Sequence, residues 1–358
     1  MKILFDYSIF AYQTLGGISR YYINLDKEIK KQYSCNIVAP AHYNKYLKEY
    51  SFYHGAYFKK FPKFTNDIFN FYNKVFTKSF IQSNNPNVYH KTYYNDFWPK
   101  NFKGKKFLTV YDLIHEKFYK EYNFPINYRP KKKALDNSDA IFTISHKTKK
   151  DLIELYGISE KKIFVTHLGI NLEFNNSNMN IIKDPFILYV GDRKRYKNFK
   201  NLLKAFAMSK KINENFKLVV FGGGEFFEDE KKFFSKNNLN ENKIIKIDGN
   251  DDILTSLYKS ANLFVFPSKY EGFGLPLLEA ATNNCPIACS RIEVFEEIMS
   301  NNVRYFDPNS IEDMIDNMEE VLFSDTLANN LINKAKSISN NFSWSKCAKE
   351  TLKVYKII

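Results

Sequence analysis

The chain has 358 residues, of which 44% are hydrophobic, and its formal net charge is +14. This length predicts two domains with cores of ordinary size. No apolar segment reaches the roughly 18 to 20 residues that a membrane-spanning helix needs, so the composition excludes a protein of that class. The N-terminal segment meets Asp6 too early for a signal peptide, and Cys35, Cys285, Cys289 and Cys347 have neither zinc nor redox spacing. We therefore expect a cytoplasmic protein that holds no metal.

The positive charge is concentrated in the first half of the chain. Residues 1–180 contain 28 Lys+Arg against 15 Asp+Glu, whereas residues 181–358 contain 25 against 24. An AT-rich genome would spread lysine over both halves, so the asymmetry favours a functional cause. A basic domain suits nucleic acid, an anionic membrane surface or a phosphorylated acceptor.

Short apolar runs alternate with helical patterns along the first half, which predicts parallel α/β architecture. Between Tyr43 and Gln82, aromatic residues are interleaved with lysine; we expect these aromatics to pack on the core rather than to meet a membrane interface. Predicted helices are Ile18–Lys31 and Thr148–Tyr156, the latter capped by Gly157. Predicted strands are Lys2–Tyr7, Cys35–Ala39, Asn87–His90, Lys106–Tyr111, Ala140–Ser145 and Ile163–His167.

The second half repeats the alternation more clearly. We expect a first domain over residues 1–170, a polar linker over 171–184, a second domain over 185–343, and a last helix over 344–358 that crosses back onto the first domain. Predicted helices are Asn198–Ser209, Ile253–Ser260, Leu275–Thr282 and Val294–Met299, and the pattern after Pro308 is helical throughout. Predicted strands are Phe186–Val190, Lys217–Phe221, Ile244–Ile247, Leu263–Phe266 and Pro286–Cys289.

Two carboxylates bracket the loop that follows the predicted strand Leu263–Phe266. Glu271 lies in a glycine-containing loop, Pro276 suits the first turn of the next helix, and Glu279 falls just inside that helix. Free amides and the helix dipole attract a diphosphate, while carboxylates accept hydrogen bonds from sugar hydroxyls. The pattern favours a nucleotide sugar as ligand, although a helix dipole alone also favours Glu in a first turn.

Cations follow the predicted strand Phe186–Val190. After Gly191 the sequence places Arg193, Arg195 and Lys197 before a helix. Fixed cations there would stabilise a departing diphosphate, and Arg grips phosphate oxygens bidentately. The alternative for each residue is a solvated cation in a loop.

Two further glycine-containing loops follow predicted strands. Gly16 and Gly17 precede a helix near the N-terminus, and Gly222 and Gly223 follow Lys217–Phe221. Such glycines let the backbone approach a phosphate, but they also serve plain turns. Arg20 faces either a ligand or solvent.

The segment Phe264–Glu279 resembles the E-x7-E motif of family 4 glycosyltransferases, and the resemblance extends over nearly the full chain. It implies the GT-B fold, an α/β architecture of two doubly wound Rossmann-like domains that face each other across a cleft. The combined motifs look like those of bacterial mannosyl- or perosamine-type transferases of surface polysaccharide biosynthesis. That group is retaining and independent of metal, and the departing phosphate deprotonates the acceptor on the same face of the sugar.

The resemblance also implies roles for individual residues. Glu271 holds the donor sugar and stabilises its developing charge, while Glu279 holds the ribose. Arg193 and Lys197 clamp the diphosphate, with Arg195 as an alternative to Arg193. The remaining donor contacts come from Gly16, Gly17, Gly191, Gly222, Gly223, Phe273, Gly274 and Leu275.

One position departs from the family pattern. Family members commonly carry a His that contacts the transferred sugar where this chain has Tyr111. A phenol does not take up a proton near neutral pH as an imidazole does. Either Tyr111 supplies only a hydrogen bond, or the nearby His115 replaces the missing His, or activity is altered.

We therefore expect a transferase that moves a hexose from a nucleotide diphosphate sugar, GDP-linked in preference to UDP-linked, to a glycan or lipid-linked acceptor in O-antigen or capsule biosynthesis. It needs no cofactor beyond that donor, and the basic domain provides peripheral contact with the inner face of the cytoplasmic membrane. Alternatives are a UDP-sugar-dependent glucosyl or N-acetylhexosaminyl transferase, a nucleotide-sugar epimerase or hydrolase of the same fold, and a basic protein that binds anionic lipid or RNA. No RNA-binding motif is present.

Overall fold

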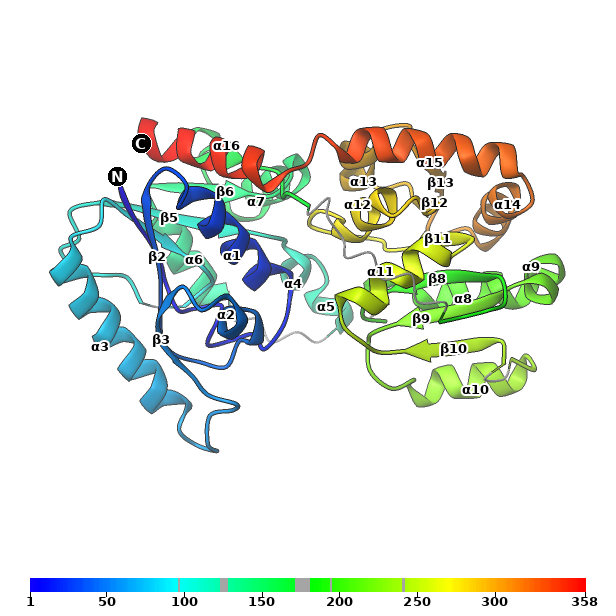
Figure 1. The fold of residues 1–358 in the computed structure, drawn as a ribbon, viewed down its shortest axis with the longest axis horizontal. Helices are drawn as coiled ribbons and strands as arrows, with labels where there is room; N and C mark the ends of the chain where they lie inside the picture. Colours follow the sequence, from blue (N-terminus) through cyan, green and yellow to red (C-terminus); the bar gives the residue numbers. More distant parts are fainter. Residues whose placement is uncertain (96, 123–127, 171–180, 194, 240–241) are drawn as a thin grey trace. The chain divides into compact units, whose positions relative to one another are not determined.

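The computed structural model describes residues 1–95, 97–122, 128–170, 181–193, 195–239 and 242–358. The chain divides into two compact units (Figure 1). The N-terminal unit comprises Met1–Gly169 together with Ser343–Ile358, and the C-terminal unit comprises Ile170–Phe342. The predicted linker over residues 171–184 lies mostly outside the described residues.

The N-terminal unit is built on a seven-stranded parallel sheet in the order β3-β2-β1-β4-β5-β6-β7. The strand order reverses between β1 and β4, and parallel sheets of this kind bind ligands at the carboxyl ends of the strands around such a point. The strands are β1 (Lys2–Phe5), β2 (Ser34–His42), β3 (Tyr53–Tyr57), β4 (Val88–Lys91), β5 (Lys105–Val110), β6 (Ala140–Thr143) and β7 (Ile163–Val165).

Helices cover this sheet, and one of them comes from the far end of the chain. Helix α16 packs against α1, and its Tyr355 hydroxyl hydrogen bonds Nδ1 of His90 at 2.5 Å. The Tyr355 ring also lies 4.7 Å from the Phe107 ring. The helices of this unit are α1 (Gly17–Ile29), α2 (Lys45–Tyr50), α3 (Asn66–Asn84), α4 (Ile114–Lys117), α5 (Tyr119–Tyr122), α6 (Tyr128–Asp136), α7 (His146–Tyr156) and α16 (Trp344–Ile357).

The C-terminal unit is built on a six-stranded parallel sheet in the order β10-β9-β8-β11-β12-β13, which reverses between β8 and β11. Its strands are β8 (Phe186–Val190), β9 (Lys217–Phe221), β10 (Ile244–Ile247), β11 (Leu263–Phe266), β12 (Ile287–Ser290) and β13 (Arg304–Phe306). Its helices are α8 (Phe199–Met208), α9 (Lys210–Asn215), α10 (Glu228–Lys236), α11 (Asp251–Ser260), α12 (Leu275–Thr282), α13 (Glu293–Met299), α14 (Ile311–Leu322) and α15 (Asp325–Ser339). Both units are therefore doubly wound α/β sheets, which confirms the predicted fold class.

The predicted bounds match most closely in the C-terminal unit. The bounds of β8, β9, β10, β11 and α12 are those predicted from the sequence, and Gly157 caps α7 with φ 63° as expected. Strands β3 and β13 were not predicted from the sequence. The first is an edge strand with exposed residues, and the second has only three residues, so neither carries a long apolar run.

The expectation that the aromatics between Tyr43 and Gln82 pack on the core is wrong for much of α3. Phe71, Tyr72 and Phe76 are exposed, and the buried side chains of this helix are Asn73, Thr77 and Ile81. No helix among the described residues is both long and apolar enough to cross a bilayer.

Two buried histidines make the N-terminal unit sensitive to acid. Burial lowers the pKa of His42 to about 4 and that of His90 to about 3, from an ordinary value of 6.5. Below pH 6.5 the unfolded chain therefore binds protons that the folded chain does not, and stability falls as the pH falls. Each histidine contributes a slope of about 1.4 kcal/mol per pH unit until its folded pKa is approached.

We predict that the free energy of unfolding, measured by urea titration, falls between pH 6.5 and pH 4.5. The His42→Gln variant should show a slope smaller by about 1.4 kcal/mol per pH unit, since glutamine does not titrate. Carboxylates change the free energy of unfolding with pH equally in both proteins, so the difference between the two slopes reports His42 alone. Equal slopes for wild type and variant would contradict the assignment.

Candidate functional site

A glycine sets the start of α12 beside Glu271 in the C-terminal unit. Gly274 caps the helix with φ 112°, and a Cβ atom there would lie 3.1 Å from the Phe295 ring. A side chain at this position would therefore be both strained and crowded. Pro276 has no N–H and the Leu277 amide donates to the Gly274 carbonyl at 2.9 Å, but the dipole of the helix still makes its start positive. Glu279 follows in the same helix, where its Oε2 accepts a hydrogen bond from the Tyr258 hydroxyl at 3.3 Å.

Glu271 and Lys197 form an ion pair with 2.6 Å between Oε1 and Nζ. The side chains are 11% and 17% exposed, respectively. Lys197 ends the short 3-10 helix Arg195–Lys197 after β8, and Glu271 follows β11, the neighbouring strand. The Lys269 amide donates to the Tyr196 carbonyl at 2.8 Å, which holds the two loops together. The pair thus lies where the strand order of the sheet reverses.

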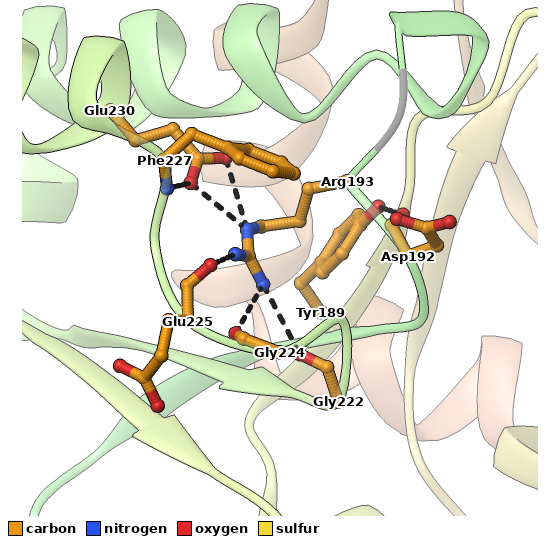
Figure 2. A network of polar contacts seen from close by, with 8 residues as sticks. All are labelled: Tyr189, Asp192, Arg193, Gly222, Gly224, Glu225, Phe227 and Glu230. Atoms are coloured by element: carbon orange, nitrogen blue, oxygen red, sulfur yellow. Dashed lines mark hydrogen bonds and ion pairs between the residues drawn. The ribbon is translucent and has the colours of Figure 1, made fainter. Parts of the chain in front are cut away.

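Arg193 is buried, and its guanidinium binds the chain itself (Figure 2). Its Nε donates to both carboxylate oxygens of Glu230, at 3.0 and 3.2 Å. The terminal nitrogens donate to the carbonyls of Gly222 and Gly224, each at 3.2 Å, and of Glu225 at 2.6 Å. These five hydrogen bonds to four residues therefore fix the loop after β9 to the start of α10.

The same network explains the glycine at position 223. A Cβ atom on Gly223 would lie 2.7 Å from a terminal nitrogen of Arg193 and 2.8 Å from the Gly191 carbonyl oxygen. Glu230 also accepts from the Phe227 amide at 2.7 Å, so one carboxylate both caps α10 and anchors the arginine. Glu230 was not predicted from the sequence; its position three residues after the helix cap was the available signal.

The predicted residues of the N-terminal unit occupy different environments. Gly16 and Gly17 form the start of α1, as expected for a loop that precedes a helix. Tyr111 is buried and packs edge-on against Tyr21 with 5.8 Å between ring centroids. Burial raises the pKa of Tyr111 well above its ordinary value, so this phenol can donate but cannot serve as a base near neutral pH. His115 is exposed on the short helix α4.

A hollow that the sequence analysis missed lies at the carboxyl ends of β1 and β4. Tyr12 and Tyr93 stack there with 4.8 Å between ring centroids and 22° between planes. Aromatic faces with amide groups around them suit a sugar, because its C–H surface packs on the rings and its hydroxyls pair with the amides. The lining residues are Tyr7, Ser8, Ala11, Tyr12, Tyr43, Phe61, Asn66, Asn70, Tyr93, Tyr94 and Asn95.

Two families match consecutive parts of the chain. Residues 15–174 match the family described as Glycosyltransferase Family 4, and residues 173–338 match the family described as Glycosyl transferases group 1. The chain therefore belongs to the glycosyltransferases of these families.

Similar proteins and solved structures are also glycosyltransferases or share the fold. The chain is 24% identical to O-antigen chain mannosyltransferase B of Escherichia coli over 237 residues, which are 63% of this chain and 62% of that protein. The match thus spans about three fifths of that relative's length. Two solved structures resemble the fold: a glycosyltransferase from Rickettsia africae (TM-score 0.73, 21% identity, 99% of this chain and 97% of that one) and Anabaena Alr3699/HepE in complex with UDP-glucose (TM-score 0.77, 13% identity, 100% of both).

We predict that Arg193→Gln destabilises the protein in the absence of any ligand, by about 3 to 5 kcal/mol, because it leaves the Glu230 carboxylate buried without its partner. The measurement is the free energy of unfolding. The matched control is Arg291→Gln: Arg291 pairs with Glu296 at 2.9 Å, but both side chains are about half exposed, so the loss should stay below about 1 kcal/mol. Equal losses for the two variants would contradict the structural role of Arg193.

Proposed function

We propose that this protein is a retaining, metal-independent glycosyltransferase that moves a hexose from a nucleotide diphosphate sugar to a glycan or lipid-linked acceptor in surface polysaccharide biosynthesis. The Lys197–Glu271 pair at the start of α12 carries this proposal. It places a cation, a carboxylate and a positive helix end in one loop region, and a donor with a pyrophosphate and a sugar needs all three.

The donor that we propose is a GDP-linked hexose of the mannose or perosamine type. The similarity to an E. coli O-antigen mannosyltransferase supports the mannose type. The Anabaena complex with UDP-glucose supports a nucleotide sugar as donor in this fold. The ribose hydroxyls would bind Glu279, and the amides of Phe273–Leu275 would bind the diphosphate. No cofactor or metal is proposed in addition to this donor.

The residues of the chain would promote transfer by binding and by electrostatics. Lys197 would leave Glu271 and pair with the diphosphate, whose negative charge grows as the bond to the sugar breaks. Glu271 would then accept hydrogen bonds from the sugar hydroxyls and stabilise the positive charge on the ring. The departing phosphate oxygen would take the proton of the acceptor hydroxyl as the new bond to C1 forms on the same face.

We propose different roles for the cations that follow β8. Arg193 is engaged by Glu230 and three carbonyls, so we propose that it positions the Gly222–Gly224 loop rather than clamping the diphosphate. Arg195, exposed in the 3-10 helix that also contains Lys197, is our candidate for the second diphosphate cation. For the acceptor we propose the aromatic hollow beside Tyr12 and Tyr93, because stacked rings suit a sugar. Tyr111 would contribute at most a donated hydrogen bond.

We also propose that the protein works in the cytoplasm in peripheral contact with the inner face of the cytoplasmic membrane. The excess of 13 positive charges over residues 1–180 (28 against 15) supports an anionic surface as partner.

We predict that Glu271→Gln and Lys197→Gln each lower kcat/KM by about 10²- to 10³-fold, since each removes charge stabilisation from the transition state. The assay follows release of the nucleoside diphosphate with a chosen acceptor, with and without EDTA. Arg291→Gln serves as the control and should keep full activity. NMR of the product should show retained anomeric configuration.

Three results would contradict the proposal. An inverted linkage would reject the retaining mechanism, and loss of activity with EDTA would reject metal independence. Conversion of the donor without any acceptor would indicate an epimerase or a hydrolase.

A further inference from the structure

Helix α3 is oriented with polar residues toward the sheet. Asn73 is fully buried: its Oδ1 accepts from the Ala41 amide at 2.7 Å, and its Nδ2 donates to the Ala41 carbonyl at 3.0 Å. Thr77 and Ile81 complete the buried face. Two hydrogen bonds to strand β2 therefore hold the helix in place, where an apolar face would be usual for a helix on a sheet.

Five apolar or aromatic residues of α3 face away from the sheet. Ile68, Phe71, Tyr72, Val75 and Phe76 are all exposed, with Ile68 66%, Phe71 69% and Val75 52% accessible. Their spacing of i, i+3, i+4, i+7 and i+8 places them on one side of the helix, and we call them the apolar stripe. Figure 1 shows α3 as an outer helix of the N-terminal unit.

Lysines lie beside the apolar stripe. Lys59, Lys60 and Lys63 are exposed just before the helix, and Lys74 and Lys78 lie within it. Asp67 is the one acidic residue between positions 51 and 85. Phe64, which adjoins these lysines, is 98% exposed. Lysines beside exposed aromatic and aliphatic side chains complement an anionic lipid surface, where the apolar groups enter the acyl boundary and the lysines meet headgroups.

We propose that the apolar stripe docks the protein on an anionic lipid bilayer. The inference rests on the proposed function for its purpose: a lipid-linked acceptor would lie at the same surface. Asn66 and Asn70, in the first turns of α3, line the aromatic hollow, so docking through this helix would bring the hollow to the lipid headgroups. A protein partner with an acidic rim, or a second copy of this chain, would be the competing occupant.

The experiment is sedimentation of the full chain with vesicles of phosphatidylglycerol and phosphatidylcholine, against vesicles of phosphatidylcholine alone. Wild type should bind the anionic vesicles and bind them less at high salt. The Phe71→Ser/Val75→Ser double variant should bind at least about tenfold more weakly, because both side chains would otherwise enter the bilayer. Both residues are exposed, so its melting temperature should equal that of wild type.

Two further variants serve as controls for the contributions of apolar contact and of charge to vesicle binding. Leu155→Ser/Met208→Ser removes two apolar side chains that are 47% and 60% exposed on α7 and α8, and it should bind as wild type does. The variant with Lys59, Lys60 and Lys63 changed to Gln should bind more weakly and depend less on salt.

Three outcomes would overturn the proposal: no binding of wild type to anionic vesicles, equal binding by the Phe71→Ser/Val75→Ser variant, or a stripe-dependent dimer in sedimentation velocity without vesicle binding. Vesicle binding needs no donor, and Glu271→Gln should leave it unchanged. Failure of docking is therefore distinguishable from failure of the proposed transferase activity.

Discussion

The candidate site depends on one ion pair. Lys197 and Glu271 come from loops that follow adjacent parallel strands, β8 and β11, and their charged atoms lie 2.6 Å apart. Neither charge is stable in a largely buried position without an opposite charge nearby. Without ligand, each side chain therefore satisfies the other; a diphosphate could take the place of Glu271 as the partner of Lys197, and sugar hydroxyls could take the place of Lys197. In the proposed reaction the ion pair orders both side chains and is exchanged for contacts with the donor.

Other contacts of the C-terminal unit order neighbouring loops. Arg193 and Glu230 fix the Gly222–Gly224 loop, and Gly274 sets the start of α12. Arg193 shows that the role of an arginine after a strand depends on its surroundings and not on residue type alone. A buried arginine whose donors are satisfied by carbonyls and a carboxylate organises backbone, whereas the same side chain turned toward solvent would bind an anion.

The sequence predicted most of the fold and only part of the site. Strands β8 to β11 and helix α12 were predicted correctly, because short apolar runs and the Gly and Pro signals of a helix start are local features. The relation between Arg193 and Glu230 could not be predicted, since the residues are 37 positions apart and their contact depends on the loop after β9. Helix α3 was also misjudged. Its apolar period is visible in the sequence, but the period does not tell which face meets the sheet, and buried Asn73 decides that.

Calorimetric titration of GDP and of a GDP-hexose into ligand-free protein tests the exchange of partners most directly. The account predicts that Lys197→Met weakens binding of both ligands, because the diphosphate loses its cation. It predicts that Glu271→Gln leaves GDP binding intact or tighter, since Lys197 is no longer held, while the added affinity from the hexose disappears. Equal weakening of GDP binding by both variants, or no effect of Lys197→Met, would contradict it.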